Sequence, residues 1–109
     1  MNTSNNSTVL SIPVTDAVKV GVAVDFTGAI AKNKKAMGIC IVDTDANDIA
    51  PVKFLGSVLA LAGGAISKGD KVVTDANGCL IKHTSEDYYE GYAAEDATAG
   101  SLFELLRGM

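Results

Sequence analysis

Apolar and polar residues alternate with a period of two along residues 18–24, where four valines are separated by Lys, Gly and Ala. This period is the one expected of a half-buried β-strand. The next four residues, 25–28, read Asp-Phe-Thr-Gly and carry Asp and Gly at positions that a tight turn favours. Residues 75–78, Asp-Ala-Asn-Gly, repeat this pattern after another apolar run, so the sequence predicts two strand-and-turn segments of one kind.

The match between the turns extends to a longer repeat. In two segments a strand opens on Gly, an Asp follows five residues later, and a second apolar strand ends on Gly after a polar loop. The residues concerned are Gly38, Asp43 and Gly56 in the first segment and Gly91, Asp96 and Gly108 in the second. We therefore predict that residues 18–56 and 69–108 are two copies of one β unit that differ by short insertions.

The repeat also bears on two ambiguous segments. Residues 99–107 would fit a short amphipathic helix on propensity alone. Their counterpart at 49–55 carries Pro51 near its start, which a strand tolerates, so strand is favoured in both copies. Residues 58–61, between the copies, stay open between a strand and a helical turn. With about eight to ten short strands and closely spaced turns, we predict a mainly β fold, a small sandwich or barrel.

The first eight residues differ from the rest. Residues 1–8 contain no large apolar side chain beyond Met1, so we predict a flexible N-terminal arm. Residues 9–109 are then predicted to form a single β domain, because a chain of 109 residues supports one modest core. Only 6% of the residues are aromatic, so Val, Ile, Leu and Ala must build that core.

The net charge of the chain limits the kinds of molecule that we expect it to bind. The net charge of −4 argues against nucleic acid, whose phosphates would repel the surface. The one local basic cluster, Lys32, Lys34 and Lys35, has no interleaved aromatic residues and is predicted to be a solvated hairpin tip. No apolar run approaches the roughly 20 residues of a membrane span, and no secretion signal is visible at the N-terminus. We therefore expect no membrane partner and synthesis in the cytoplasm.

In that compartment, Cys40 and Cys79 should be reduced thiols. Each has apolar neighbours in the sequence, which predicts two small buried residues. Two cysteines and the single histidine do not complete a tetrahedral zinc site. The Gly63-Gly64 pair lacks the pattern of a phosphate-binding loop.

Catalytic and metal-binding candidates are few. His83 is the only histidine, and the polar residues after it are predicted to form a solvated loop rather than a catalytic set. The acidic loop 43–48 begins like a calcium loop, but Asp48 and Phe54 stand where Gly and Glu are expected, so a β-turn is favoured. Tyr88, Tyr89 and Tyr92 could stack on a sugar or a partner, or could belong to a strand with one face in the core. We therefore predict no catalytic residue, no metal and no cofactor, and a protein that is not an enzyme.

Two stretches resemble the tailed-phage capsid cement, or head decoration, proteins. The first, residues 61–78, matches a family phrase of small residues and turn residues at Ala62 to Ile66, Gly69-Asp70, Val72, Asp75 and Gly78. The second follows at residues 91–100, Gly-Tyr-Ala-Ala-Glu-Asp-Ala-Thr-Ala-Gly, and precedes a closing apolar strand. The resemblance covers nearly all of residues 18–108 and is looser in the first copy. Its signatures are mostly turn residues, which specify a fold better than an activity.

The resemblance implies a β-tulip-like fold and a role without catalysis. Family members attach to the outer surface of the expanded phage head, often as trimers, and bridge neighbouring subunits of the major capsid protein. It therefore implies the major capsid protein as partner, a homotrimer, and a place on the outer capsid surface of the virion after assembly in the host cytoplasm.

The N-terminal arm and the segment after it are the candidate contact region. They could order on the shell by adding a strand to a capsid sheet edge, and simple fraying is the alternative. The candidate contact residues are Thr3, Asn5, Ser7, Val9, Leu10 and Ile12.

A carrier domain is the alternative function. Residues 66–72 resemble turns of lipoyl- and biotin-carrier domains, which are also pseudo-duplicated β sandwiches. The carrier lysine should lie at an exposed hairpin tip between the halves, flanked by Asp or Met, and no such tip stands at the midpoint of this chain. Capsid decoration is therefore the preferred prediction.

Overall fold

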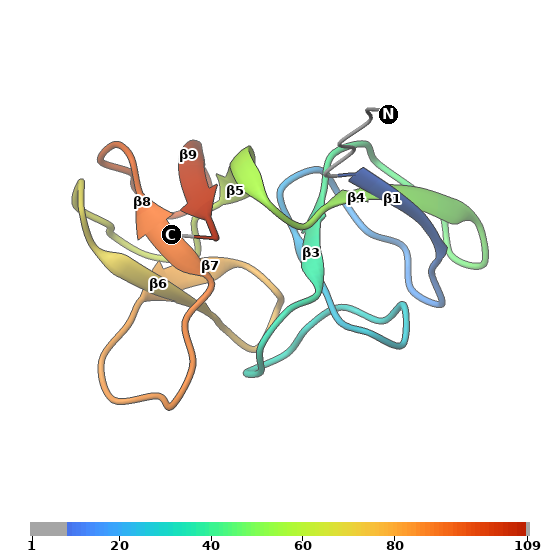
Figure 1. Ribbon diagram of the computed structural model, residues 1–109, viewed down its shortest axis with the longest axis horizontal. Helices are drawn as coiled ribbons and strands as arrows, with labels where there is room; N and C mark the ends of the chain where they lie inside the picture. The colour runs from blue at the N-terminus through green and yellow to red at the C-terminus, as the bar shows by residue number, and fades with distance from the viewer. Residues whose placement is uncertain (1–8, 109) are drawn as a thin grey trace, which may run out of the picture.

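A computed structural model describes residues 9–108, and within this range the chain forms β-strands and no helix (Figure 1). The predicted mainly β fold is confirmed, and residues 58–61 prove to be strand. The strands are β1 (Val9–Pro13), β2 (Ala23–Val24), β3 (Gly38–Cys40), β4 (Ile49–Lys53), β5 (Gly56–Leu61), β6 (Lys71–Thr74), β7 (Leu80–Lys82), β8 (Gly91–Ala93) and β9 (Leu102–Arg107).

The strands form two antiparallel sheets that lie side by side. The first sheet has the order β1-β4-β3-β2, and the second has the order β5-β9-β8-β6-β7. Figure 1 shows the first sheet, from the blue β1 to the green β4, on one side of the molecule and the second, from the light-green β5 to the red β9, on the other. The chain crosses between them once, from β4 to β5, through Phe54 and Leu55.

The sheet orders confirm two pseudo-repeated units. Strands β1, β4, β3 and β2 correspond in order to β5, β9, β8 and β6. The β6–β7 pairing, which includes Thr74 and Leu80, is reduced in the first unit to an isolated bridge between Val24 and Ile30. Each unit includes a first strand, β1 or β5, that the predicted repeats of 18–56 and 69–108 left out. β1 and β5 occupy equivalent places in the two sheets, but their sequences show no common pattern. β1 exposes more of its residues than β5 does, so the two strands need different side chains.

Matching hydrogen bonds support the equivalence of the units. The Asp43 carboxylate accepts a bond of 2.8 Å from the Val20 N–H, and the Asp96 carboxylate accepts one of 2.8 Å from the Lys68 N–H. In the two tight turns, the Asp25 and Asp75 carboxylates each accept backbone N–H groups two and four residues later. The repeated Asp residues of the sequence are thus side-chain caps that hold equivalent turns.

The larger core cluster contains residues from both sheets. Ala23 and Ile39 of the first sheet belong to the same buried cluster as Val72, Phe103 and Leu105 of the second. A second cluster, which includes Val18, Val24 and Val52, lies within the first unit. Val18, Val22 and Val24 are buried, as the alternation along residues 18–24 predicts, whereas Val20 is only partly buried. The predicted strand is shorter than this pattern, since only Ala23–Val24 form β2, and Ala23 on the opposite side is buried as well.

A charged residue occupies one inward position of β9. Phe103, Leu105 and Arg107 alternate along the buried face of the strand, and Arg107 is only 8% exposed. Its guanidinium donates a bond of 2.8 Å to the carboxylate of Glu90, which is 2% exposed. A buried charge is tolerated only when it is paired, and Arg107 is the nearer of two cations at Glu90, the other being the half-exposed Lys35 at 3.9 Å.

The same pair connects the two units. The second carboxylate oxygen of Glu90 accepts a bond of 3.0 Å from the N–H of Ala36, in the first unit. Arg107 also donates from Nε to the carbonyl of Phe54, between the two sheets, at 3.1 Å. The ion pair therefore holds β9, the β2–β3 connection and the junction of the sheets in one arrangement.

Removing one partner of this pair should destabilise the protein strongly. We expect Arg107→Met to lower the free energy of unfolding by about 3–5 kcal/mol, because it leaves the buried Glu90 carboxylate with only the half-exposed Lys35 ammonium, 3.9 Å away, in place of the buried guanidinium at 2.8 Å. Denaturant unfolding followed by circular dichroism measures the loss.

The double variant Glu90→Leu/Arg107→Met is the control, because it removes both charges. It should recover most of the lost stability, since the buried charge that makes the single variant costly is gone. Equal losses in the single and double variants would contradict a cost that arises from the unpaired charge.

Candidate functional site

The predicted contact residues divide into two groups. Thr3, Asn5 and Ser7 lie outside the described residues. Val9, Leu10 and Ile12 lie on β1, which pairs along its whole length with β4 of the same chain.

The three residues on β1 have different surroundings. Ile12 packs against the core of the first unit, whereas Leu10 is 46% exposed. Val9 lines a groove between the two units. The structure thus brings Val9 and Leu10 to the surface and places Ile12 inward.

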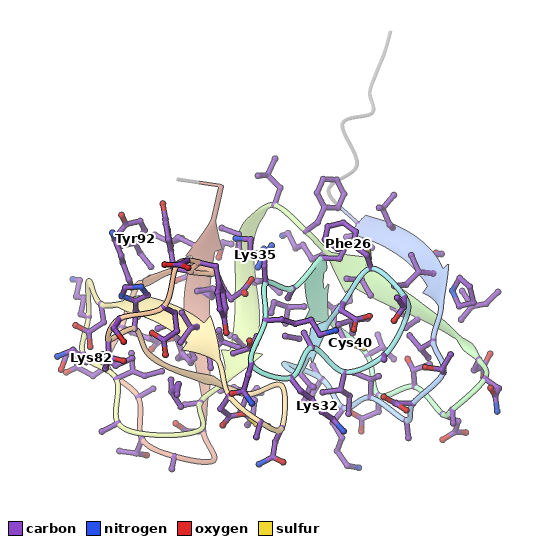
Figure 2. The ribbon with its side chains drawn as sticks, turned by 90° about the horizontal axis from the view of Figure 1, so that it is seen from below. Phe26, Lys32, Lys35, Cys40, Lys82 and Tyr92 are labelled. Atoms are coloured by element: carbon purple, nitrogen blue, oxygen red, sulfur yellow. The ribbon has the colours of Figure 1, made fainter. Side chains whose placement is uncertain are left out.

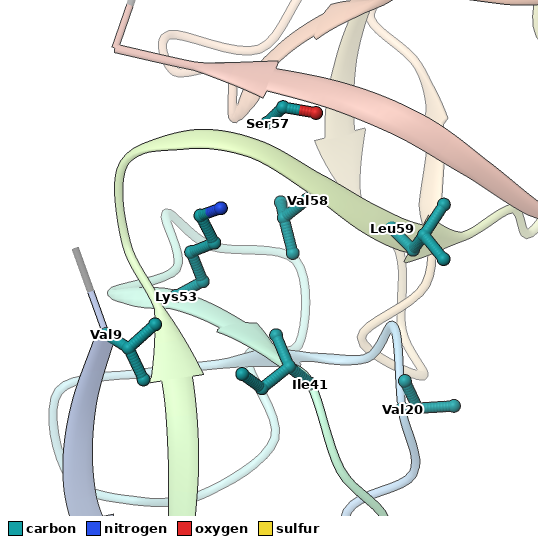
Figure 3. A pocket seen from close by; sticks show the side chains of 7 residues that line it. All are labelled: Val9, Val20, Ile41, Lys53, Ser57, Val58 and Leu59. Carbon is teal, nitrogen blue, oxygen red and sulfur yellow. The ribbon is translucent and has the colours of Figure 1, made fainter. Parts of the chain in front are cut away.

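The groove lies where the first sheet meets the second. Its volume is about 290 Å³, near the lower end of ligand pockets. The residues that line it are Val9, Val20, Ile41, Lys53, Ser57, Val58 and Leu59. Figure 3 shows Val58 and Ile41 on opposite sides of the space, Val9 at one end, and Leu59 and Val20 at the other. The lining is apolar except for one hydroxyl and one ammonium group.

Exposed leucines continue the apolar surface beside the groove. Leu59 is 52% exposed and Leu102 is 43% exposed. Their positions in the β5–β9 register, one diagonal step apart, place both on the outward face of the second sheet. An apolar groove with an apolar rim is a feature of protein interaction surfaces.

Gly21 allows the first unit to approach this rim. It has φ +89°, and a Cβ at this position would lie 2.7 Å from Leu102 Cδ2 and 2.8 Å from the Leu61 nitrogen. The close approach permits a bond of 2.8 Å from the Leu61 N–H to the Gly21 carbonyl. The loop that carries Val20 is therefore held against one end of β5.

The three lysines of the basic cluster are exposed, as predicted, but two of them have partners in the structure. The Lys34 ammonium lies 3.0 Å from the Asp25 carboxylate. Lys35 donates to the carbonyl of Tyr89 and lies 5.7 Å from the centroid of the Tyr89 ring. Both side chains stay largely exposed. Lys34 joins the two ends of the β2–β3 loop, and Lys35 connects this loop to the one before β8, which the order of residues in the sequence does not show.

The tyrosines form part of the same surface. Lys71 lies 4.9 Å from the Tyr89 ring centroid, and the Tyr89 and Tyr92 rings meet edge to face at 5.6 Å. Figure 2 shows Tyr92, Lys35 and the 76% exposed Phe26 along one side of the molecule. The rings are half-buried, so they cover the edge of the core and also present a surface.

Asp25 is the most strongly perturbed acid on this surface. Burial raises the pKa of its carboxyl, but hydrogen bonds from the Thr27 hydroxyl, from Lys34 and from two backbone N–H groups outweigh burial and lower the pKa to about 2. The ionised form is thus favoured in the folded protein, and it contributes stability above the ordinary pKa of 3.8.

This contribution should disappear in acid. As the pH falls from 3.8 through about 2, the Asp25 carboxylate takes up a proton and about 2 kcal/mol of stability is lost. The stability difference between wild type and Asp25→Asn, measured by denaturant unfolding at several pH values, should shrink over this window. Asp45→Asn, on the exposed acidic loop, changes the net charge equally, and a similar change in its profile would rule out the local explanation.

The other candidate residues, His83 and those of the acidic loop, form hydrogen bonds to residues close to them in the chain. His83 Nε2 lies 2.7 Å from the Glu86 carbonyl, within the loop after β7. In the acidic loop, the Asp48 carboxylate accepts the N–H of Ile49. Among residues 9–108 no three His, Cys, Asp or Glu side chains are grouped as a metal site.

The two thiols have different environments. Cys40 is buried as predicted, whereas Cys79 is only partly buried, so that prediction is wrong for Cys79. Burial and, to a lesser degree, the Asp75 carboxylate raise the pKa of the Cys79 thiol. A raised pKa lowers the thiolate fraction, and with it the reactivity of the thiol.

A family model for phage cement proteins matches residues 3–108. The chain belongs to the phage cement protein family. The resemblance seen in the sequence is thereby confirmed, and the family does not favour the carrier alternative. No curated protein matches the chain in sequence. Within the described range, no helix is long and apolar enough to cross a membrane.

A solved structure shares the fold. The N base of head fiber gp8.5 in bacteriophage phi29 superimposes with a TM-score of 0.78 at 22% sequence identity, over 92% of each chain. At this identity the likeness shows the fold alone. It independently supports the assignment of this cement family member to a small all-β architecture.

Sequence reasoning missed the groove and the buried ion pair. The groove combines residues 9, 20, 41, 53 and 57–59, which no local pattern connects. The sequence does contain an indication of the ion pair, because the period of two on β9 places Arg107 on the same face as Phe103 and Leu105. A charged residue at an inward position predicts a buried partner, although the pattern does not identify Glu90.

Proposed function

We propose that this chain decorates the outer surface of the expanded phage head and bridges neighbouring subunits of the major capsid protein. The observation that carries the proposal is the match of nearly the whole chain to phage cement proteins. The structural neighbour is named as the base of a head fiber, so a second protein of this fold is associated with a phage head. The role is non-catalytic and uses no cofactor.

The physical basis of such a role is linkage. A protein that binds the assembled shell and not its separate subunits stabilises the shell by mass action. Each copy that contacts two subunits opposes their separation, and many symmetry-related copies add together. In this proposal the protein meets the shell after assembly in the host cytoplasm, and three copies form a homotrimer that joins several subunits.

The surface of this chain fits a protein partner. The groove and the exposed Leu59 and Leu102 form an apolar area on a molecule whose net charge is −4. Apolar surface of this kind is stabilised when a partner covers it. We assign the groove, its rim and the outward residues Val9 and Leu10 to the contact with the capsid.

Binding should depend on the maturation state of the head. We expect the purified protein to co-sediment with expanded heads and not with unexpanded heads, because bridging sites form only when capsid subunits take their final spacing. Electron microscopy of the mixtures locates the bound copies. Absence from both kinds of head would contradict the proposed function.

The N-terminal residues should add to the affinity. In our proposal Thr3, Asn5 and Ser7 contact the shell, next to Val9 and Leu10 on β1. Deletion of residues 2–8 should weaken attachment to expanded heads and leave the melting temperature of the free protein unchanged, because their sequence contains no large apolar side chain. Unaltered attachment of the deletion variant would remove the arm from the contact.

A further inference from the structure

Strand β5 is an edge strand beside the groove. It stands at the end of the order β5-β9-β8-β6-β7, so among the described strands only β9 pairs with it. The groove lies on the side of β5 away from β9 and is lined by Ser57, Val58 and Leu59 (Figure 3). An edge strand offers unpaired backbone groups to another chain.

The hydrogen bonds at the end of β5 show which backbone groups face the groove. The Ala62 N–H donates to the Ser101 carbonyl, just before β9, whereas the Leu61 N–H donates to Gly21 on the opposite side. Successive N–H groups of a strand alternate in direction, so those of Ser57 and Leu59 point to the same side as that of Leu61. Both therefore face away from β9, into the groove.

The equivalent edge of the first unit is blocked. The Val14 N–H donates to the Asp48 carbonyl next to β4, as the Ala62 N–H does to Ser101 next to β9. Pro13 therefore corresponds to Leu61 and occupies an outward position of β1, where it has no N–H to donate. Proline on an edge strand is a protection against pairing with other chains. Strand β5 lacks this protection between Gly56 and Leu61.

The groove also indicates the side chains that it would accept. Val20, Ile41 and Val58 supply apolar walls, and the volume of about 290 Å³ suits one or two aliphatic side chains rather than a larger molecule. Lys53 places an ammonium group in the lining, and none of the ion pairs formed within residues 9–108 involves it. A carboxylate next to the aliphatic residue would complement this charge.

We propose that the β5 edge binds an extended segment of the partner by strand addition, through main-chain hydrogen bonds to Ser57 and Leu59. The segment places an aliphatic side chain in the groove and an acidic side chain near Lys53. This inference rests on the proposed function, in which the partner is the major capsid protein. The recognition combines backbone pairing for affinity with a side-chain pocket for specificity.

The test uses Leu59→Pro and Leu59→Ala with expanded heads. The outward N–H of Leu59 is not used in pairing with β9, so proline removes one donor from the docking edge and leaves the sheet intact. Leu59→Ala is the matched control, since it shortens the same side chain and keeps the N–H. We expect Leu59→Pro to weaken co-sedimentation about tenfold relative to Leu59→Ala, the order of one lost interface hydrogen bond.

A second measurement does not depend on how well the proline variant folds. In hydrogen exchange of the wild-type protein, the amides of Ser57 and Leu59 should exchange fast when free and become protected on expanded heads. Lys53→Glu should weaken binding most at low ionic strength, because it reverses the charge that faces the segment.

The outcomes separate the two proposals. Failure of the wild-type protein to bind expanded heads would overturn the proposed function and this inference together. Wild-type binding with equal affinity of the proline and alanine variants, or with no added protection at residues 57–59, would overturn strand addition and leave the decoration role standing.

Discussion

The buried ion pair between Arg107 and Glu90 is the constraint on which the arrangement of the two sheets depends. Each charge is tolerated in the interior only because the other lies 2.8 Å away and further polar groups complete its hydrogen bonds. Those further groups belong to the first unit and to Phe54 at the junction. A different placement of the sheets would leave a charge buried alone, so the pair selects one arrangement from those that the apolar core alone would allow.

The groove lies at the junction of the two sheets, which the Arg107–Glu90 pair holds together. Lys53 and Ser57 line the groove and lie on either side of the short connection from β4 to β5. Neither unit alone contains the site, because Val20 and Ile41 come from the first unit and Leu59 from the second. Duplication of one β unit thus supplies the scaffold, and the join of the copies supplies a surface that neither copy has.

The copies differ most at their edges. Pro13 closes the outward side of β1, whereas Leu61, at the equivalent place, bonds to Gly21 and leaves the rest of β5 open. The units also differ in their tight turns, where Lys34 reinforces Asp25 and the described structure shows no such cation at Asp75. Similar backbones therefore carry different surfaces, and the interaction chemistry lies in these differences.

The sequence by itself determined the elements whose signals are local. The Asp and Gly residues of the turns and the strand at residues 102–107 were predictable, since each depends on neighbours a few positions away, whereas the period of two along residues 18–24 predicted a longer strand than the two residues of β2. The repeat and the family resemblance follow from the same turn residues. Only the tertiary structure decided the membership of β1 and β5 in the units, the partners of Lys34 and Lys35, the pairing of Arg107 with Glu90, and the groove. These depend on contacts between residues far apart in the chain, and a single sequence shows which side chains need a partner but not which partner folding brings to them.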